Sequence, residues 1–139
     1  MDTPARTDIL AANLLYASVG LLVLYQVAGW VSQALGLPHN YFSPVHFNLL
    51  AAAGLGVTAL IRVGLAYAVR RGVLAAKLLL ALGFVVLLYS GTYWDKGVVA
   101  GVDFAHFGMA SLLLLLNSLL TLAALAAMFW PARDAAPLV

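Results

Sequence analysis

The chain has 139 residues, of which 65% are hydrophobic and 9% are charged, and its formal net charge is +2. Soluble globular domains carry about 25% charged residues, so this composition places the chain among membrane proteins, with room for a single domain. The sequence lacks a basic stripe outside its apolar segments, which argues against a nucleic-acid partner. It also lacks cysteine, so disulfides, thiolate metal sites and thiol redox chemistry are excluded.

Four apolar segments follow one another along the chain, at 9–35, 45–69, 73–94 and 104–130, and the fourth helix is predicted over 98–130. A membrane-spanning helix needs ~20 mostly apolar residues, because the hydrocarbon core is about 30 Å thick and a helix rises about 1.5 Å per residue. Every segment reaches this length. Short connections between them predict an all-α, up-down-up-down bundle of four transmembrane helices, which forms one integral membrane domain.

The distribution of Lys and Arg predicts the orientation of the bundle, because positive residues beside short loops stay on the cytoplasmic side. With both termini cytoplasmic, only Lys96 falls outside, beside Asp95. The positive residues then on or near the cytoplasmic face are Arg6, Arg70, Arg71, Lys77 and Arg133. We therefore expect both termini inside, and the short loops with an Ala-, Leu- and Gly-rich composition favour a bacterial cytoplasmic (inner) membrane.

The first segment is predicted to remain as a helix rather than to be removed as a signal peptide. Asp2 and Asp8 dilute the positive charge expected there, and the apolar run exceeds the h-region length of about 7–15 residues. Gln26 and Gln33 share one face of its outer half. Such glutamines either bond to neighbouring helices, at ~1 kcal/mol, or line a pocket, so Gln26 is a candidate ligand-binding residue.

The second segment contains two candidate residues, His46 near its outer boundary and Arg62 toward the cytoplasmic end. Arg62 either extends to the interface and contacts a helix carbonyl, or it anchors an anionic lipid head group or a substrate phosphate or carboxylate. The turn at 69–72 predicts that the second and third helices form a hairpin. Small residues, including Gly54 and Gly83, predict close contacts between helices.

The fourth segment carries Asp103, His106, Asn117 and Thr121 on one helical face. Asp103 and His106 are spaced i, i+3, so their side chains can meet on a helix. They could form a carboxylate–imidazole pair that binds a cation, a haem edge or a quinone carbonyl, or that moves a proton. The alternative, which we favour, is an interfacial helix start where Asp103 is stabilised by the helix N-terminus.

Two histidines at similar depth, His46 and His106, raise the possibility of a b-type haem, and Asp103 could join them in a divalent metal site. No i, i+4 histidine pair supports a metal, and His46 lies close to water, so ordinary interfacial histidines are the simpler interpretation. Together with Gln26 and Tyr93, these residues place polar or aromatic groups from all four helices in the outer third of the bundle. That convergence is the candidate site, either a ligand pocket or a docking surface, unless it only marks the membrane boundary.

Familiar catalytic motifs are missing from the sequence, which has no Gly-rich phosphate loop, no nucleophile elbow and no HExxH. An enzyme is therefore not supported. We expect a non-catalytic accessory subunit that packs against, or assists assembly of, a larger membrane complex. The alternatives are a small oligomeric transporter or channel for an ion, metal or lipid, and a haem- or quinone-binding redox protein using His46 and His106. The expected partners are membrane lipids and other membrane subunits or further copies of this chain.

Overall fold

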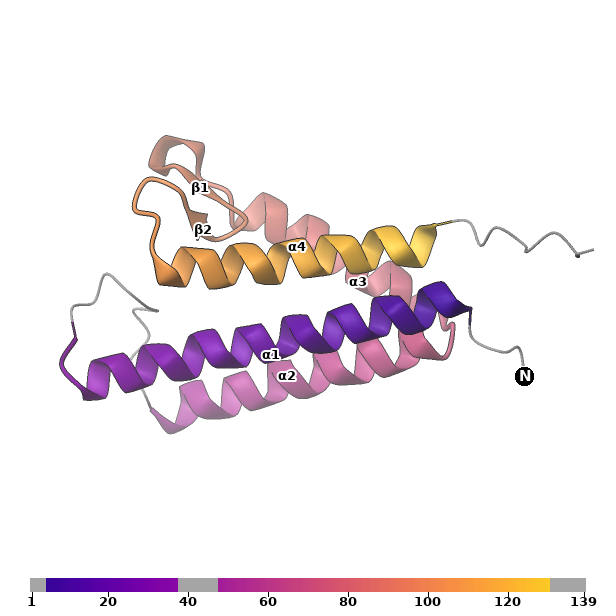
Figure 1. Ribbon diagram of the computed structural model, residues 1–139, viewed down its shortest axis with the longest axis horizontal. Helices are drawn as coiled ribbons and strands as arrows, with labels where there is room; N and C mark the ends of the chain where they lie inside the picture. Colours follow the sequence, from indigo (N-terminus) through magenta and orange to yellow (C-terminus); the bar gives the residue numbers. More distant parts are fainter. Residues whose placement is uncertain (1–4, 38–47, 131–139) are drawn as a thin grey trace, which may run out of the picture.

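The computed structural model describes residues 5–37 and 48–130 of the chain. These residues are mostly helical, as the composition predicted (Figure 1). The helices are α1 (Arg6–Ala34), α2 (Leu49–Arg70), α3 (Leu74–Ser90) and α4 (Met109–Phe129). Between α3 and α4 lie a short 3₁₀ helix, η2 (Trp94–Lys96), and two short strands, β1 (Val98–Val99) and β2 (Val102–Asp103).

Three helices, α1, α2 and α4, are long and apolar enough to cross a membrane. With 29, 22 and 21 residues, they extend about 44, 33 and 32 Å at about 1.5 Å per residue. Helix α3 has 17 residues and extends only about 26 Å, against a hydrocarbon core of about 30 Å. Its predicted range of 73–94 was therefore too long: α3 ends at Ser90, and the Gly91 carbonyl instead accepts a hydrogen bond from Gly101 N at 2.7 Å.

The fourth helix begins at Met109, so the prediction of a helix from residue 98 was wrong. The strands β1 and β2 pair antiparallel, with Val98 opposite Asp103 and Val99 opposite Val102. The two residues between the strands have positive φ, at 50° for Ala100 and 80° for Gly101. β-branched residues on either side of such a two-residue turn favour a hairpin over a helix. Asp103 and His106 therefore do not share a helical face with Asn117.

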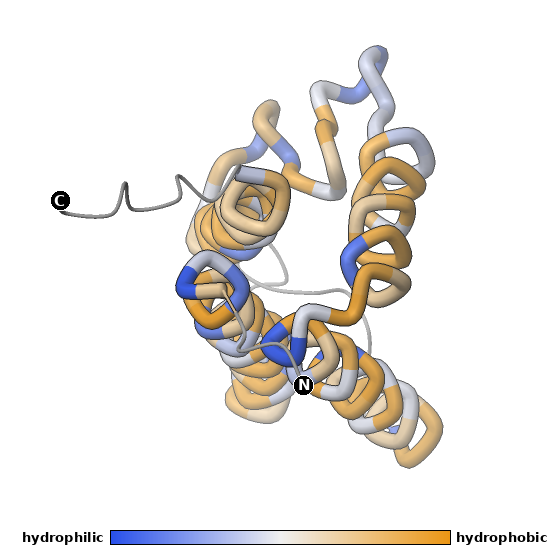
Figure 2. The backbone as a smooth tube through the Cα atoms, turned by 90° about the vertical axis from the view of Figure 1, so that its right-hand side faces the viewer, coloured by the Kyte–Doolittle hydropathy of each residue, from blue (hydrophilic) through white to orange (hydrophobic). Residues whose placement is uncertain are grey.

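The helices are arranged in an arc in the order α4, α1, α2, α3 (Figure 2). The start of α1, the turn between α2 and α3, and the end of α4 lie together at one end of the molecule (Figure 1). The hydrophobic core is concentrated there; its buried members are Ala11, Leu15, Ala66, Val69, Ala76, Ala124, Leu125 and Met128. Elsewhere α2 and α3 expose large apolar side chains, which suits surroundings of lipid.

Four of the helical glycines do not make the close helix contacts that were predicted for them. A Cβ atom built on Gly54, Gly56, Gly64 or Gly83 would meet no other heavy atom within 4 Å. The close approach is instead at Gly91, where a Cβ would lie 3.0 Å from Gly101 N. A tight turn joins α2 to α3 as predicted, but it lies at 71–73 and not at 69–72, and Gly72 in it adopts a positive φ of 75°.

Candidate functional site

A cavity of about 450 Å³ lies between all four helices. Most of its wall is apolar, from residues such as Leu15, Leu65 and Phe84. Its polar lining residues are Ser18, Thr58, Arg62, Ser90, Asn117 and Thr121. The cavity opens to the outside along α2 and α3, where the lining residues Ile61 and Val86 are 59% and 56% exposed. The site is thus an apolar chamber with a small number of polar groups, reachable from the side.

One wall of the cavity is a hydrogen-bonded cluster between α1 and α4. Ser18 Oγ donates to Asn117 Oδ1 at 2.9 Å and lies 3.2 Å from Thr121 Oγ1. The Thr121 hydroxyl donates to the Asn117 backbone carbonyl at 2.9 Å. Asn117 and Thr121 are one turn apart, so α4 presents both toward α1. Because Ser18 and Asn117 are buried, these bonds satisfy polar groups that would otherwise be costly in an apolar interior.

The cationic group of the cavity is Arg62 on α2. It is half-buried and lies eight residues, or about 12 Å, before the helix end at Arg70. Within residues 5–37 and 48–130, its guanidinium makes no hydrogen bond and no ion pair. Of the residues predicted as site candidates, Arg62 is the one that the structure places in the cavity wall.

A buried ion pair joins α1 to α3 near the core. Lys77 Nζ lies 2.6 Å from Asp8 Oδ1, and the two side chains are 14% and 7% exposed. The sequence interpretation missed this pair, because Lys77 was taken only as a marker of orientation. The sequence did contain a signal for the pair. Asp8 lies at the start of the first helix and Lys77 at the start of the third, and both helices start on the same side of the predicted bundle. The position of Asp8 near a helix N-terminus adds a favourable interaction with the helix dipole.

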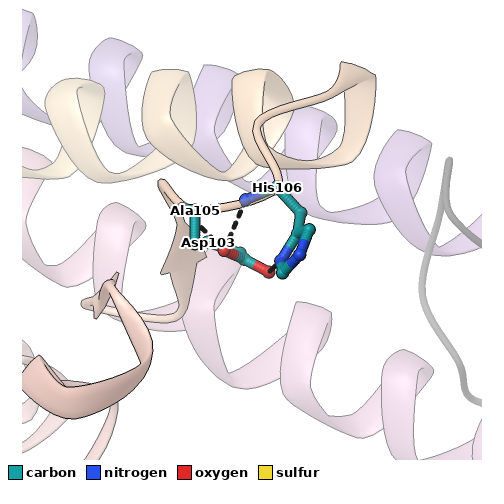
Figure 3. Close-up of polar contacts among 3 residues, drawn as sticks. All are labelled: Asp103, Ala105 and His106. Atoms are coloured by element: carbon teal, nitrogen blue, oxygen red, sulfur yellow. Dashed lines mark hydrogen bonds and ion pairs between the residues drawn. The ribbon is translucent and has the colours of Figure 1, made fainter.

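The Asp103 and His106 side chains meet, but in a turn and not on a helix (Figure 3). Asp103 Oδ1 accepts hydrogen bonds from the backbone N–H groups of Ala105 and His106, both at 2.9 Å. Asp103 Oδ2 lies 3.3 Å from His106 Nδ1. The His106 side chain is 87% exposed and that of Asp103 is 40% exposed. This arrangement stabilises the turn that precedes α4, and it offers no enclosed binding site.

The carboxylate of Asp103 is expected to titrate below the usual range of aspartate. The backbone N–H of His106, followed by its imidazole, lowers the pKa of Asp103. A lowered pKa in the folded state means that this stabilisation is present above the pKa of the unfolded chain and is lost as pH falls through the folded value. NMR titration of the Asp103 carboxyl carbon measures it directly. His106→Ala should raise the pKa only in part, because the backbone donor remains; an ordinary pKa in the wild type would contradict the turn geometry.

The remaining predicted candidates lie away from the cavity. Gln26 is half-buried on α1, and Tyr93 is exposed beside η2, with Lys96 Nζ 5.7 Å from its ring centroid. His46 lies outside the described residues, so its predicted proximity to His106 stays a prediction. In the described part of the chain, no group of three or more His, Asp or Glu side chains could hold a metal ion.

Comparisons with protein-family models, curated proteins and solved structures find no match to this chain. The cavity and the groups that line it are therefore the features that point to a function.

Proposed function

We propose that this chain is an integral membrane protein of four spans that binds a membrane-soluble amphiphile in the cavity between its helices. In this arrangement both termini lie on the cytoplasmic side of a bacterial inner membrane, as the positive residues predict. The 17-residue helix α3 is then a short span. Its flanks support this, with Arg70 and Arg71 before it and Tyr93 and Trp94 after it, as expected of interfacial positions.

The observation that carries this proposal is the composition of the cavity wall. Small-molecule sites are usually concavities of about 300–1,000 Å³ with mostly apolar walls and a few polar groups, and this cavity of about 450 Å³ fits that description. Ser18, Asn117 and Thr121 already bond with one another. A largely apolar chamber that opens into lipid favours an apolar chain over water as its occupant.

A substitution that fills the cavity tests this proposal. Gly83 lines the cavity, and a side chain there would meet no existing atom near its Cβ. Gly83→Leu is therefore expected to fold while reducing bound amphiphile by at least about tenfold, which corresponds to about 1.4 kcal/mol. The measurement is native mass spectrometry of protein extracted gently from its own membrane, with the small-molecule adduct as the readout.

Gly64→Leu is the matched control for Gly83→Leu. Gly64 lies on α2, outside the cavity lining, and it too has open space at its Cβ position. The control should keep the same adduct as the wild type. Equal adducts on all three proteins, or an adduct on none of them, would contradict the proposal.

The second candidate function is the non-catalytic accessory subunit of a larger membrane complex. The packing of α3 favours it, because Ala76 is the one buried residue in this helix. Along its length, α3 exposes Leu78, Leu82, Val85 and Tyr89. A helix so loosely held would gain contacts from another membrane subunit or a second copy of this chain. The same native mass spectra distinguish this function, because a partner adds protein mass and an amphiphile adds only a small mass.

A further inference from the structure

We infer that the cavity ligand is a single-chain amphiphile with a carboxylate head, a long-chain fatty acid, whose carboxylate pairs with Arg62. This inference rests on the proposed function, since it names the chemical class of the molecule held between the helices. It is carried by the charge of Arg62, by the neighbouring polar groups, and by the length and apolar lining of the cavity.

The positive charge of Arg62 favours binding of an anion that is not one of the described residues. A guanidinium at membrane depth is costly unless it is paired or reaches water. The acidic residues in the described part of the chain are engaged or distant: Asp8 pairs with Lys77, while Asp95 and Asp103 lie in the connection between α3 and α4. A carboxylate matches the planar fork of the guanidinium, because two parallel N–H···O bonds can form between them.

The surroundings of Arg62 suit the head of such a molecule. Thr58 lies one turn before Arg62 on α2, so its hydroxyl falls on the same face of the helix and lines the same cavity. The cluster of Ser18, Asn117 and Thr121 forms a polar part of the cavity wall where α1 and α4 border the cavity. Polar groups from all four helices therefore line the cavity, and Arg62 is its one cationic lining residue within the described part of the chain.

The length and apolar lining of the cavity favour a hydrocarbon chain as the tail of the ligand. Its volume of about 450 Å³ lies within the usual range of small-molecule sites, about 300–1,000 Å³. The lining on α3 extends from Leu79 to Ser90, which is about 16 Å along the helix axis. The cavity is thus long as well as apolar.

The test is a binding measurement on the full chain in neutral detergent, with radiolabelled palmitate as the probe. Arg62→Gln should weaken palmitate binding by at least about tenfold. Arg62→Lys should bind palmitate less tightly than the wild type but more tightly than Arg62→Gln, because the charge remains while the two parallel N–H···O bonds of the guanidinium are lost. Arg70→Gln is the matched control, since Arg70 is exposed on the same helix outside the cavity, and it should bind as the wild type does. Unlabelled palmitate should compete, and its neutral methyl ester should compete at least about tenfold less well.

Suppose that Gly83→Leu still blocks palmitate binding. Equal binding of palmitate by the wild type and Arg62→Gln would then overturn this inference and leave the proposed function standing. Equal competition by palmitate and its methyl ester would have the same meaning. A phospholipid mass retained in the cavity would also overturn it. If Gly83→Leu leaves palmitate binding unchanged, or if the wild type binds neither palmitate nor its ester and carries no other small-molecule adduct, the proposed function fails together with the inference. Thermal unfolding of each variant confirms that a loss of binding is not a loss of fold.

Discussion

Lys77→Ala is expected to lower the free energy of unfolding by about 3–5 kcal/mol, because it leaves the buried carboxylate of Asp8 without its partner. The 2.6 Å contact lies where the start of α1 meets the start of α3, and both side chains are largely buried. The pair also tethers α3, which has only one buried residue of its own. Reversible unfolding in a mixed-detergent titration provides the measurement.

Two further variants separate the ion pair from a general effect of charge. Lys96→Ala removes an exposed lysine beside Tyr93, and it should change the free energy of unfolding by no more than about 0.5 kcal/mol. Replacing both partners at once, Asp8→Leu with Lys77→Met, should restore much of the loss, because no buried charge is left unpaired. Equal losses for Lys77→Ala and Lys96→Ala would show that the pair does not hold α3.

Asn117→Leu is expected to lower the free energy of unfolding by about 1–2 kcal/mol, since it removes the closer partner of the buried Ser18 hydroxyl and leaves the longer contact with Thr121 Oγ1. Leucine keeps the branched shape of asparagine but is larger, so the loss combines the missing hydrogen bond with local repacking. Asn13→Leu is the control: Asn13 is exposed on α1, and its replacement should have little effect. A double-mutant cycle with Ser18→Ala isolates the coupling between the two residues. Zero coupling would mean that the bond between α1 and α4 contributes nothing to stability.

Hydropathy predicted four helices, and the structure has four in the described residues, of which three are long and apolar enough to cross a membrane. A span of that length is visible in the sequence because the bilayer sets it. The beginning of α4 was missed for a physical reason. Residues 98–102 are as apolar as a helix would be, and hydropathy alone cannot separate a short valine-rich hairpin from a helical turn. The β-branched Val98 and Val99, with Gly97 and Gly101 around them, were the signal for the hairpin.

The candidate site was predicted only in part. Arg62 stood out because a charge within an apolar helix must be explained. Asn117 and Thr121 were placed correctly on one face of the fourth helix. No sequence motif marks Ser18 as a site residue. Its hydrogen bond to Asn117 depends on which residues of α4 lie opposite it on α1. The pair of Asp8 and Lys77 likewise depends on how close the start of α3 comes to the start of α1, which the side of the predicted bundle alone does not determine.

The most direct measurement of the central claim is a crystal structure of the protein grown from a lipid phase, examined for electron density between the helices. An elongated density is expected in the cavity bordered by Ser18, Phe84 and Asn117, with its polar end at the Arg62 guanidinium. A cavity closed by α3 side chains packed against α1 and α4, or filled with ordered water alone, would contradict the claim that this bundle holds an amphiphile.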